Sequence, residues 1–200
     1  MMRAHNAAVD LVVAMYLVVM CFAAPADAAP MDEAAAALRR GDYAAALKLI
    51  RPLAEQGNAL AQFNLGVSYD QGWGVQPHAG EALKWYRLAA DQGYSLAQQN
   101  LGDIYSSGRG VPQDFAQALK WYGLAADQGN AFAQNGLGLM YENGQGVPQD
   151  IVRAHMWFNL SGSQGHERGL KNRERVRASI TNVQLAEAQK LARGWKPAGK

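Results

Sequence analysis

The sequence has few charged residues and almost no cysteine. Charged residues make up 18% of its 200 residues, and Cys21 is the single cysteine. One cysteine excludes an intrachain disulfide framework and any zinc site that needs several cysteine ligands. The formal net charge of +2 gives no reason to expect a nucleic-acid partner. Hydrophobic residues still make up 49% of the chain, which suffices for one folded domain with a sizeable core.

Motifs for catalysis and metal binding are also missing from the sequence. The histidines are too scattered to form a metal site; they are His5, His78, His155 and His166. No nucleophile elbow, phosphate-binding loop or zinc-peptidase motif occurs. We therefore predict no catalytic residue, no metal and no cofactor.

Residues 1–28 have the pattern of a secretory signal peptide. The apolar stretch from Leu11 to Ala24 is too short to span a membrane as a helix, which needs about 20 residues. Small residues follow, so we expect cleavage after Ala28, with Ala26 as the second choice and an uncleaved anchor as the alternative. We therefore expect an exported, periplasmic protein without cysteine in its mature chain, and export argues against nucleic-acid binding.

The chain contains an internal repeat with a period of 36 residues. Aligned without gaps, residues 58–93 and 94–129 are identical at 21 of 36 positions, and residues 94–129 and 130–165 at 16. Chance does not produce such agreement in fixed register. The sequence therefore predicts a repeat architecture, in which each unit buries its apolar faces against its neighbours.

Each repeat has the pattern of two helices. In residues 58–93, Ala61, Leu65 and Tyr69 are spaced four apart, which places them on one helical face. Gly66 lies beside that face, where a glycine lets a neighbouring helix approach closely. A Gly-x-Gly-Val loop follows, and its glycines permit a positive φ. The second helix begins after the aspartate of Pro-Gln-Asp in the two later repeats and ends at a glycine.

Further helices are predicted on both sides of the repeats. Residues 29–57 match half a repeat and are expected to form an N-terminal capping helix pair. Residues 166–200 are expected to form basic C-terminal capping helices over 166–178 and 182–194, the second with a capping box. This last segment holds nine Lys/Arg and three Asp/Glu, whereas residues 29–165 hold nine and twelve. The small net charge therefore hides an acidic body and a basic end.

The repeat resembles the Sel-1-like repeat family, which is related to the tetratricopeptide repeats. The resemblance rests on Ala-Gln-x-x-Leu-Gly-x-x-Tyr, Gly-x-Gly-Val-Pro-Gln-Asp and Ala-x-x-Trp-x-x-x-Ala-Ala-x-x-Gly, which recur across residues 58–165. It implies an all-α fold, a right-handed α-solenoid of antiparallel helix pairs, and an adaptor that binds proteins or peptides without chemistry. Two departures are His78, in place of the capping aspartate, and Ser161-Gly162, in place of paired alanines. The β-lactam binding of a cysteine-rich bacterial subgroup is not implied, because the paired cysteines are missing.

The same resemblance implies that the first helices of the pairs line a concave groove. Their outward positions vary between repeats while the packing positions do not, as expected of a binding face. Trp73 joins them because it is a large aromatic on a glycine-rich loop. The candidate partner-binding residues are Phe63, Val67, Asp70, Trp73, Gln99, Asp103, Ser106, Phe132, Asn135, Leu139 and Glu142. An acidic row of Asp70, Asp103 and Glu142 favours a partner peptide with apolar anchors and basic residues; the alternative is that Phe63 and Phe132 simply pack against neighbouring helices.

The basic C-terminal segment provides a second candidate surface. On a helix its cations would point several ways, as in a solvated cap, or they would contact an anionic envelope surface. They are Arg168, Lys171, Arg173, Arg175 and Arg177. Two other hypotheses stay open. The chain would be an envelope enzyme or cell-wall binder that uses the acidic row, or a structural module of a larger assembly.

Overall fold

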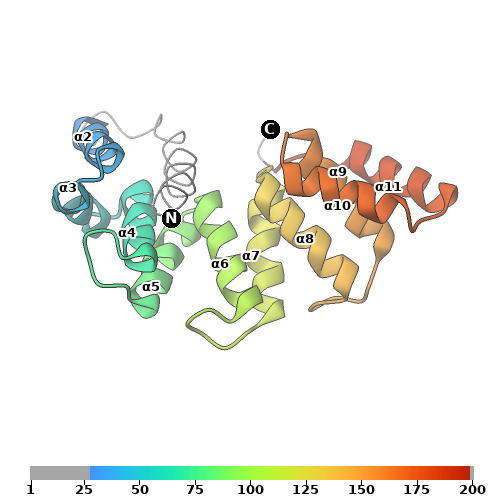
Figure 1. The fold of residues 1–200 in the computed structure, drawn as a ribbon, viewed down its shortest axis with the longest axis horizontal. Coiled ribbons are helices and arrows are strands. Elements are labelled where there is room, and N and C mark those ends of the chain that lie inside the picture. The colour runs from blue at the N-terminus through green and yellow to red at the C-terminus, as the bar shows by residue number, and fades with distance from the viewer. Residues whose placement is uncertain (1–27, 199–200) are drawn as a thin grey trace, which may run out of the picture. The chain divides into compact units, whose positions relative to one another are not determined.

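The computed structural model describes residues 28–198 (Figure 1). Every regular element in this range is a helix, so the prediction of an all-α solenoid is confirmed. The chain forms two compact units, one ending at Gln92 and the other beginning at Gly93. Unit 1 contains α2 (Ala28–Arg39), α3 (Tyr43–Glu55), α4 (Ala59–Gln71) and α5 (Ala79–Asp91). Unit 2 contains α6 (Ser95–Ser107), α7 (Phe115–Asp127), α8 (Ala131–Asn143), α9 (Ile151–Ser163), α10 (Glu167–Arg177) and α11 (Asn182–Gly194).

Capping side chains fix where the helices begin. As predicted, Asp114 caps α7, and Thr181 forms a capping box with Gln184 at the start of α11. His78 takes the place of the aspartate in the first repeat, and its Nδ1 accepts a hydrogen bond from the backbone N–H of Glu81 at 3.1 Å. The departure at His78 from the family pattern therefore leaves the cap of α5 in place.

Within each repeat, the two helices touch at a glycine. A Cβ atom added at Gly102 would lie 2.5 Å from Cε1 of Tyr122, closer than two carbon atoms approach in a packed core. The same contact recurs in the other repeats, at Gly66 with Tyr86 and at Gly138 with Phe158. The predicted close approach is therefore confirmed. The loop glycines also have the predicted positive φ; they are Gly72, Gly74, Gly108, Gly110, Gly144 and Gly146.

A pair of glutamines, one buried and one exposed, also joins the two helices of each repeat, and sequence reasoning missed it. Gln128, at the end of α7, donates from Nε2 to Oε1 of Gln98 on α6 at 2.8 Å. The pair recurs as Gln92 with Gln62 and as Gln164 with Gln134. Because a buried amide needs a hydrogen-bond partner, the pair holds the end of the second helix against the first.

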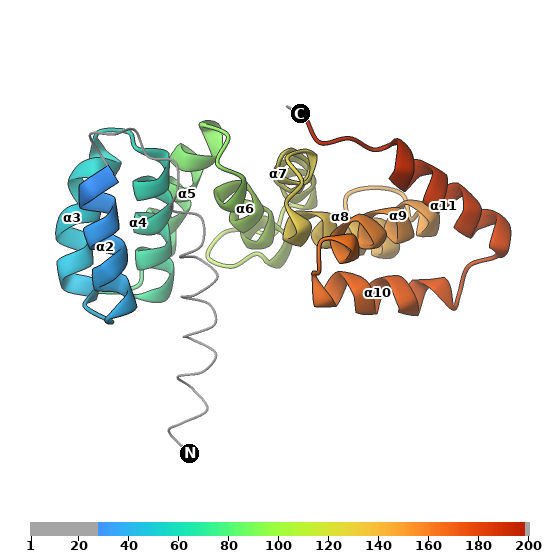
Figure 2. The same cartoon turned by 90° about the horizontal axis from the view of Figure 1, so that it is seen from above.

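The C-terminal segment forms the two predicted helices, and both pack on α9. Figure 2 shows α9 between α10 and α11, and α10 also lies against α8. The ring of Trp195 meets that of Trp157 on α9, with ring centroids 6.2 Å apart. No helix within residues 28–198 is long and apolar enough to cross a membrane. Of the predicted signal peptide, residues 1–27 lie outside the described residues.

Candidate functional site

In unit 1, the two apolar candidates are buried. Phe63 is 0% exposed and Val67 is 3% exposed. The ring of Phe63 packs on that of Tyr86, with centroids 5.9 Å apart. Both side chains were expected to face an open groove and are instead buried, as is α4 over the whole stretch 61–68. Their role in binding a partner stays a prediction.

The other two candidates of unit 1 contact neighbouring aromatic residues. Trp73 is half-buried, and its ring stacks on Tyr43 at the start of α3, with centroids 5.2 Å apart and planes at 13°. Trp73 thereby fastens the glycine-rich loop to the N-terminal helix pair. Asp70 is also half-buried, and it accepts a hydrogen bond from the hydroxyl of Tyr86 at 3.3 Å. A role of either residue in binding a partner stays a prediction.

In unit 2, the three candidates on α6 gather around one phenol. Tyr122 of α7 donates a hydrogen bond to Oδ1 of Asp103, and its hydroxyl lies 3.2 Å from Oγ of Ser106. Gln99 donates from Nε2 to the other carboxylate oxygen of Asp103. These residues form a polar cluster at the surface of the unit. Sequence reasoning did not predict that the hydroxyl of Tyr122 takes part.

The surroundings of Asp103 disfavour its charged form. The outer edge of the side chain is exposed to solvent, but the helices around it remove much of its hydration. This burial raises the pKa of Asp103 above its ordinary 3.8. Two hydrogen bonds, from Tyr122 and Gln99, and two positive charges act in the opposite direction but do not cancel the rise; the charges are those of Arg109 and Arg168. Burial and the neighbouring carboxylate raise the pKa of Tyr122, so the phenol keeps its proton and acts as the donor.

Asp103→Asn is expected to stabilise the protein at pH 7. A carboxyl group whose pKa is raised by folding favours the fold below its unfolded pKa, and this contribution is lost as the pH rises through the folded pKa. Asparagine mimics the neutral form and still accepts the bond from Tyr122. Urea unfolding should therefore give a more stable variant at pH 7 and equal stabilities near pH 3. A variant that is less stable than wild type at pH 7 would show that the ionised Asp103 is net favourable.

The candidates on α8 divide into exposed apolar and bound polar side chains. Phe132 is 37% exposed, and its ring contacts that of His166, with centroids 4.4 Å apart. Leu139 is half-buried. Asn135 is 8% exposed, and its Oδ1 accepts a hydrogen bond from Nδ2 of Asn172 on α10 at 2.9 Å. Phe132 and Leu139 therefore supply the apolar surface of α8, while Asn135 binds α10.

One carboxylate of the predicted acidic row, Glu142, is already paired in unit 2. Arg175 of α10 donates to both carboxylate oxygens of Glu142, with Nη2 to Oε2 at 2.8 Å. Such a bidentate pair neutralises Glu142 and satisfies its acceptors. Asp103 is then the remaining acidic candidate of this unit, while Asp70 belongs to unit 1. A basic peptide therefore has less to bind here than the sequence indicated.

The five basic candidates of α10 fall into two groups. Three donate hydrogen bonds to neighbouring side chains, namely Arg173, Arg175 and Arg177. Arg168 and Lys171 are exposed, and neither makes a hydrogen bond or ion pair with another side chain in residues 28–198. The cations thus do not form one uniform surface around the helix.

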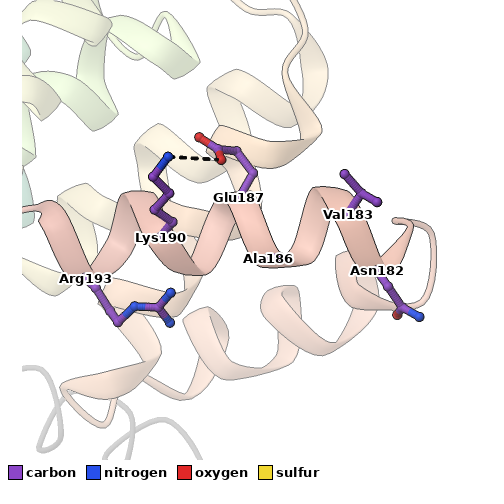
Figure 3. Close-up of a pocket in the computed structure, with 6 residues that line it drawn as sticks. All are labelled: Asn182, Val183, Ala186, Glu187, Lys190 and Arg193. Carbon is purple, nitrogen blue, oxygen red and sulfur yellow. Dashed lines mark ion pairs between the residues drawn. The ribbon is translucent and has the colours of Figure 1, made fainter.

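Two hollows lie away from the predicted positions. Figure 3 shows the one beside α11, of about 670 Å³, which is lined by Asn182, Val183, Ala186, Glu187, Lys190 and Arg193. The other, of about 310 Å³, lies between α3 and the loop after α4 in unit 1 and is lined by residues that include Leu47, Arg51 and Val75. Within residues 28–198, no group of three or more potential metal ligands occurs.

Comparisons with known proteins agree with the 36-residue repeat. The Sel1 repeat model matches residues 59–94, 95–130 and 131–166, which is more than half of the chain. The crystal structure of a Sel1 repeat protein from Oxalobacter formigenes is 38% identical, covers 64% of this chain and 97% of its own, and has a TM-score of 0.59. That of c5321, a protective antigen of uropathogenic Escherichia coli strains with an SLR fold, is 32% identical, covers 76% of this chain and 40% of its own, and has a TM-score of 0.48. None of the curated proteins matches.

Proposed function

Since the chain belongs to the Sel1 repeat family, we propose that it is a non-catalytic scaffold of the cell envelope that binds a peptide or a domain of another protein. Sel1 repeat proteins generally mediate protein–protein interactions. The envelope location rests on the signal-peptide pattern of residues 1–28. The binding surface is the open side of unit 2.

The observation that carries this proposal is how constant and variable positions are distributed in unit 2. The packing positions Leu101 and Leu137 are one repeat apart, identical and buried. The outward positions change with the same step, as from Asp103 to Leu139, and their side chains reach solvent. A constant interior with a variable outer face is what a binding surface on a repeat scaffold requires.

The surface that would bind the partner is made of the outward residues of α6, α8 and α10. We call it the α6–α8–α10 face and define it by Gln99, Asp103, Phe132, Leu139, Arg168 and Lys171. Phe132 would supply an apolar anchor, and the polar cluster around Asp103 would hydrogen-bond the partner's backbone. Because both oxygens of Asp103 already accept hydrogen bonds, this carboxylate is better suited to binding than to acid–base catalysis.

Affinity capture from the exported fraction tests the proposal. The full reading frame is expressed, and N-terminal sequencing first checks that the exported chain begins at Ala29. Wild type is expected to retain a partner protein, and Phe132→Ala to weaken its binding about tenfold or more, because truncating an anchor costs about 2 kcal/mol.

The control for this experiment is Leu124→Ala on α7. Leu124 is 42% exposed, similar to Phe132, but it lies on the second helix of its repeat. The control should retain the partner as wild type does. Equal retention by both variants, or a chain that is not exported, would contradict the proposed scaffold role in the envelope.

A further inference from the structure

The cations of α10 occupy the positions of a fourth binding helix. The 36-residue step relates Phe132, Asn135 and Leu139 of α8 to residues of α10, namely Arg168, Lys171 and Arg175. α10 lies against α9 and α8 as α8 lies against α7 and α6. α10 also begins after a capping residue one step beyond the cap of α8; the two caps are Asn130 and His166. α10 is therefore the first helix of a fourth pair and not only a solvated cap.

The contacts of α10 agree with this assignment. Arg175 reaches Glu142 of α8, and the charge of Arg168 acts on the carboxylate of Asp103 on α6. These two cations therefore lie on the side of α10 that faces the other first helices. Arg173 and Arg177 point elsewhere, since they donate to Asn159 on α9 and to Asn182 on α11, respectively.

Two exposed cations thus lie beside an exposed apolar side chain on the α6–α8–α10 face. Arg168 and Lys171 make no hydrogen bond or ion pair with another side chain of the described chain, residues 28–198. Phe132 is 37% exposed and touches His166, the capping residue of α10. With Glu142 neutralised by Arg175, two cations, Arg168 and Lys171, and one carboxylate, Asp103, remain on this face, so its net charge is positive.

We propose that this face binds an acidic segment of a partner protein, in which Asp or Glu residues flank an apolar side chain. The proposal rests on the scaffold function and names its partner class. The apolar side chain would sit on Phe132 and Leu139, and the carboxylates would pair with Arg168 and Lys171. A peptide fits better than a lipid surface, because two of the five cations are turned to α9 and α11 and the remainder flank an apolar stripe.

Panning a phage library of random peptides of about 12 residues on the purified protein tests the proposal. We expect enrichment of sequences with Asp or Glu next to Leu, Ile or Phe. A fluorescent synthetic copy of the most enriched peptide should bind, and raising NaCl from about 0.05 M to about 0.3 M should weaken its binding.

The double variant Arg168→Glu/Lys171→Glu should bind this peptide at least about tenfold more weakly than wild type does. Lys190→Glu/Arg193→Glu, which makes the same charge change on α11 (Figure 3), should bind it as wild type does.

Each of the following results would overturn the proposal, and together they distinguish its failure from failure of the scaffold function. Enriched peptides without acidic residues, or equal binding by the two double variants, would leave a scaffold with a different partner class. No enriched peptide, together with a partner captured by wild type and lost in Phe132→Ala, would show that the partner is not an acidic segment. Vesicles of phosphatidylglycerol that bind through Arg168 and Lys171, with no enriched peptide, would assign the face to a membrane surface. Failure of peptide selection and of capture together would overturn the scaffold function as well.

Discussion

Gly102→Ala is expected to lower the free energy of unfolding by about 2 to 3 kcal/mol. The added Cβ would lie 2.5 Å from Cε1 of Tyr122. The ring cannot retreat easily, because it is buried in a cluster with Ala133 and Leu137 and its hydroxyl is bound to Asp103. The clash therefore exceeds the roughly 1 kcal/mol by which alanine is favoured over glycine inside a helix.

Gly123→Ala is the matched control in the same repeat. A Cβ atom at Gly123 on α7 would have no neighbour within 4 Å. This variant should gain about 0.5 to 1 kcal/mol, since only the helix preference changes. Urea unfolding followed by far-UV circular dichroism should give midpoints on opposite sides of wild type with unchanged slopes. A Gly102→Ala variant as stable as wild type would mean that α6 and α7 do not meet at this glycine.

The helices could be predicted from the sequence because the repeat marks each packing position three times. Gly66, its equivalents and the Gly-x-Gly loops identify where the chain must approach a neighbour or turn, and no other residue suits those places. The C-terminal helices were predicted over 166–178 and 182–194 and are observed as α10 and α11 with nearly the same bounds. Local signals such as the capping box at Thr181 were sufficient there.

The open binding positions could not be predicted in the same way, because exposure depends on tertiary neighbours. Phe63 and Phe132 have the same side chain and were both expected in the groove, yet they are 0% and 37% exposed. The pair of Glu142 with Arg175 spans 33 residues and not 36. The repeat relates equivalent positions, whereas contacts between neighbouring first helices join positions that are not equivalent. Aligning the repeats therefore hides such pairs.

One packing position shows how a contact and its partner change together. Tyr86, Tyr122 and Phe158 are equivalent, and the two tyrosines place their hydroxyls against Asp70 and Asp103. Phe158 has no hydroxyl. In its repeat the equivalent of Asp103 is Leu139, and the equivalent of Asp70 is Glu142, which pairs with Arg175 instead. The third repeat has thus exchanged a contact to its own second helix for a contact to α10.

Phe158→Ala is accordingly expected to have the largest effect, a loss of about 3 to 5 kcal/mol in the free energy of unfolding. Phe158 is 0% exposed and packs in one cluster with Ala154 of α9, with Val176 of α10 and with Ile180 in the turn after α10. Removing the ring opens a cavity between α8, α9 and α10, and α10 loses the surface that positions its cations. The variant should therefore also bind the selected acidic peptide more weakly.

The control for Phe158→Ala is Phe132→Ala, which removes the same ring from the surface. Because Phe132 is 37% exposed, its loss should cost about 1 kcal/mol or less. Urea unfolding measures both costs, and hydrogen exchange should show faster exchange of the α10 amides in Phe158→Ala alone. Equal losses of stability, or unchanged exchange in α10, would mean that α10 is held in place by its polar contacts to α8, such as Asn135 with Asn172 and Glu142 with Arg175. In that case the pair of Glu142 with Arg175 would hold the fourth helix in place, and reversing the charge of Arg175 should unfold α10, whereas reversing Arg168 and Lys171 should not.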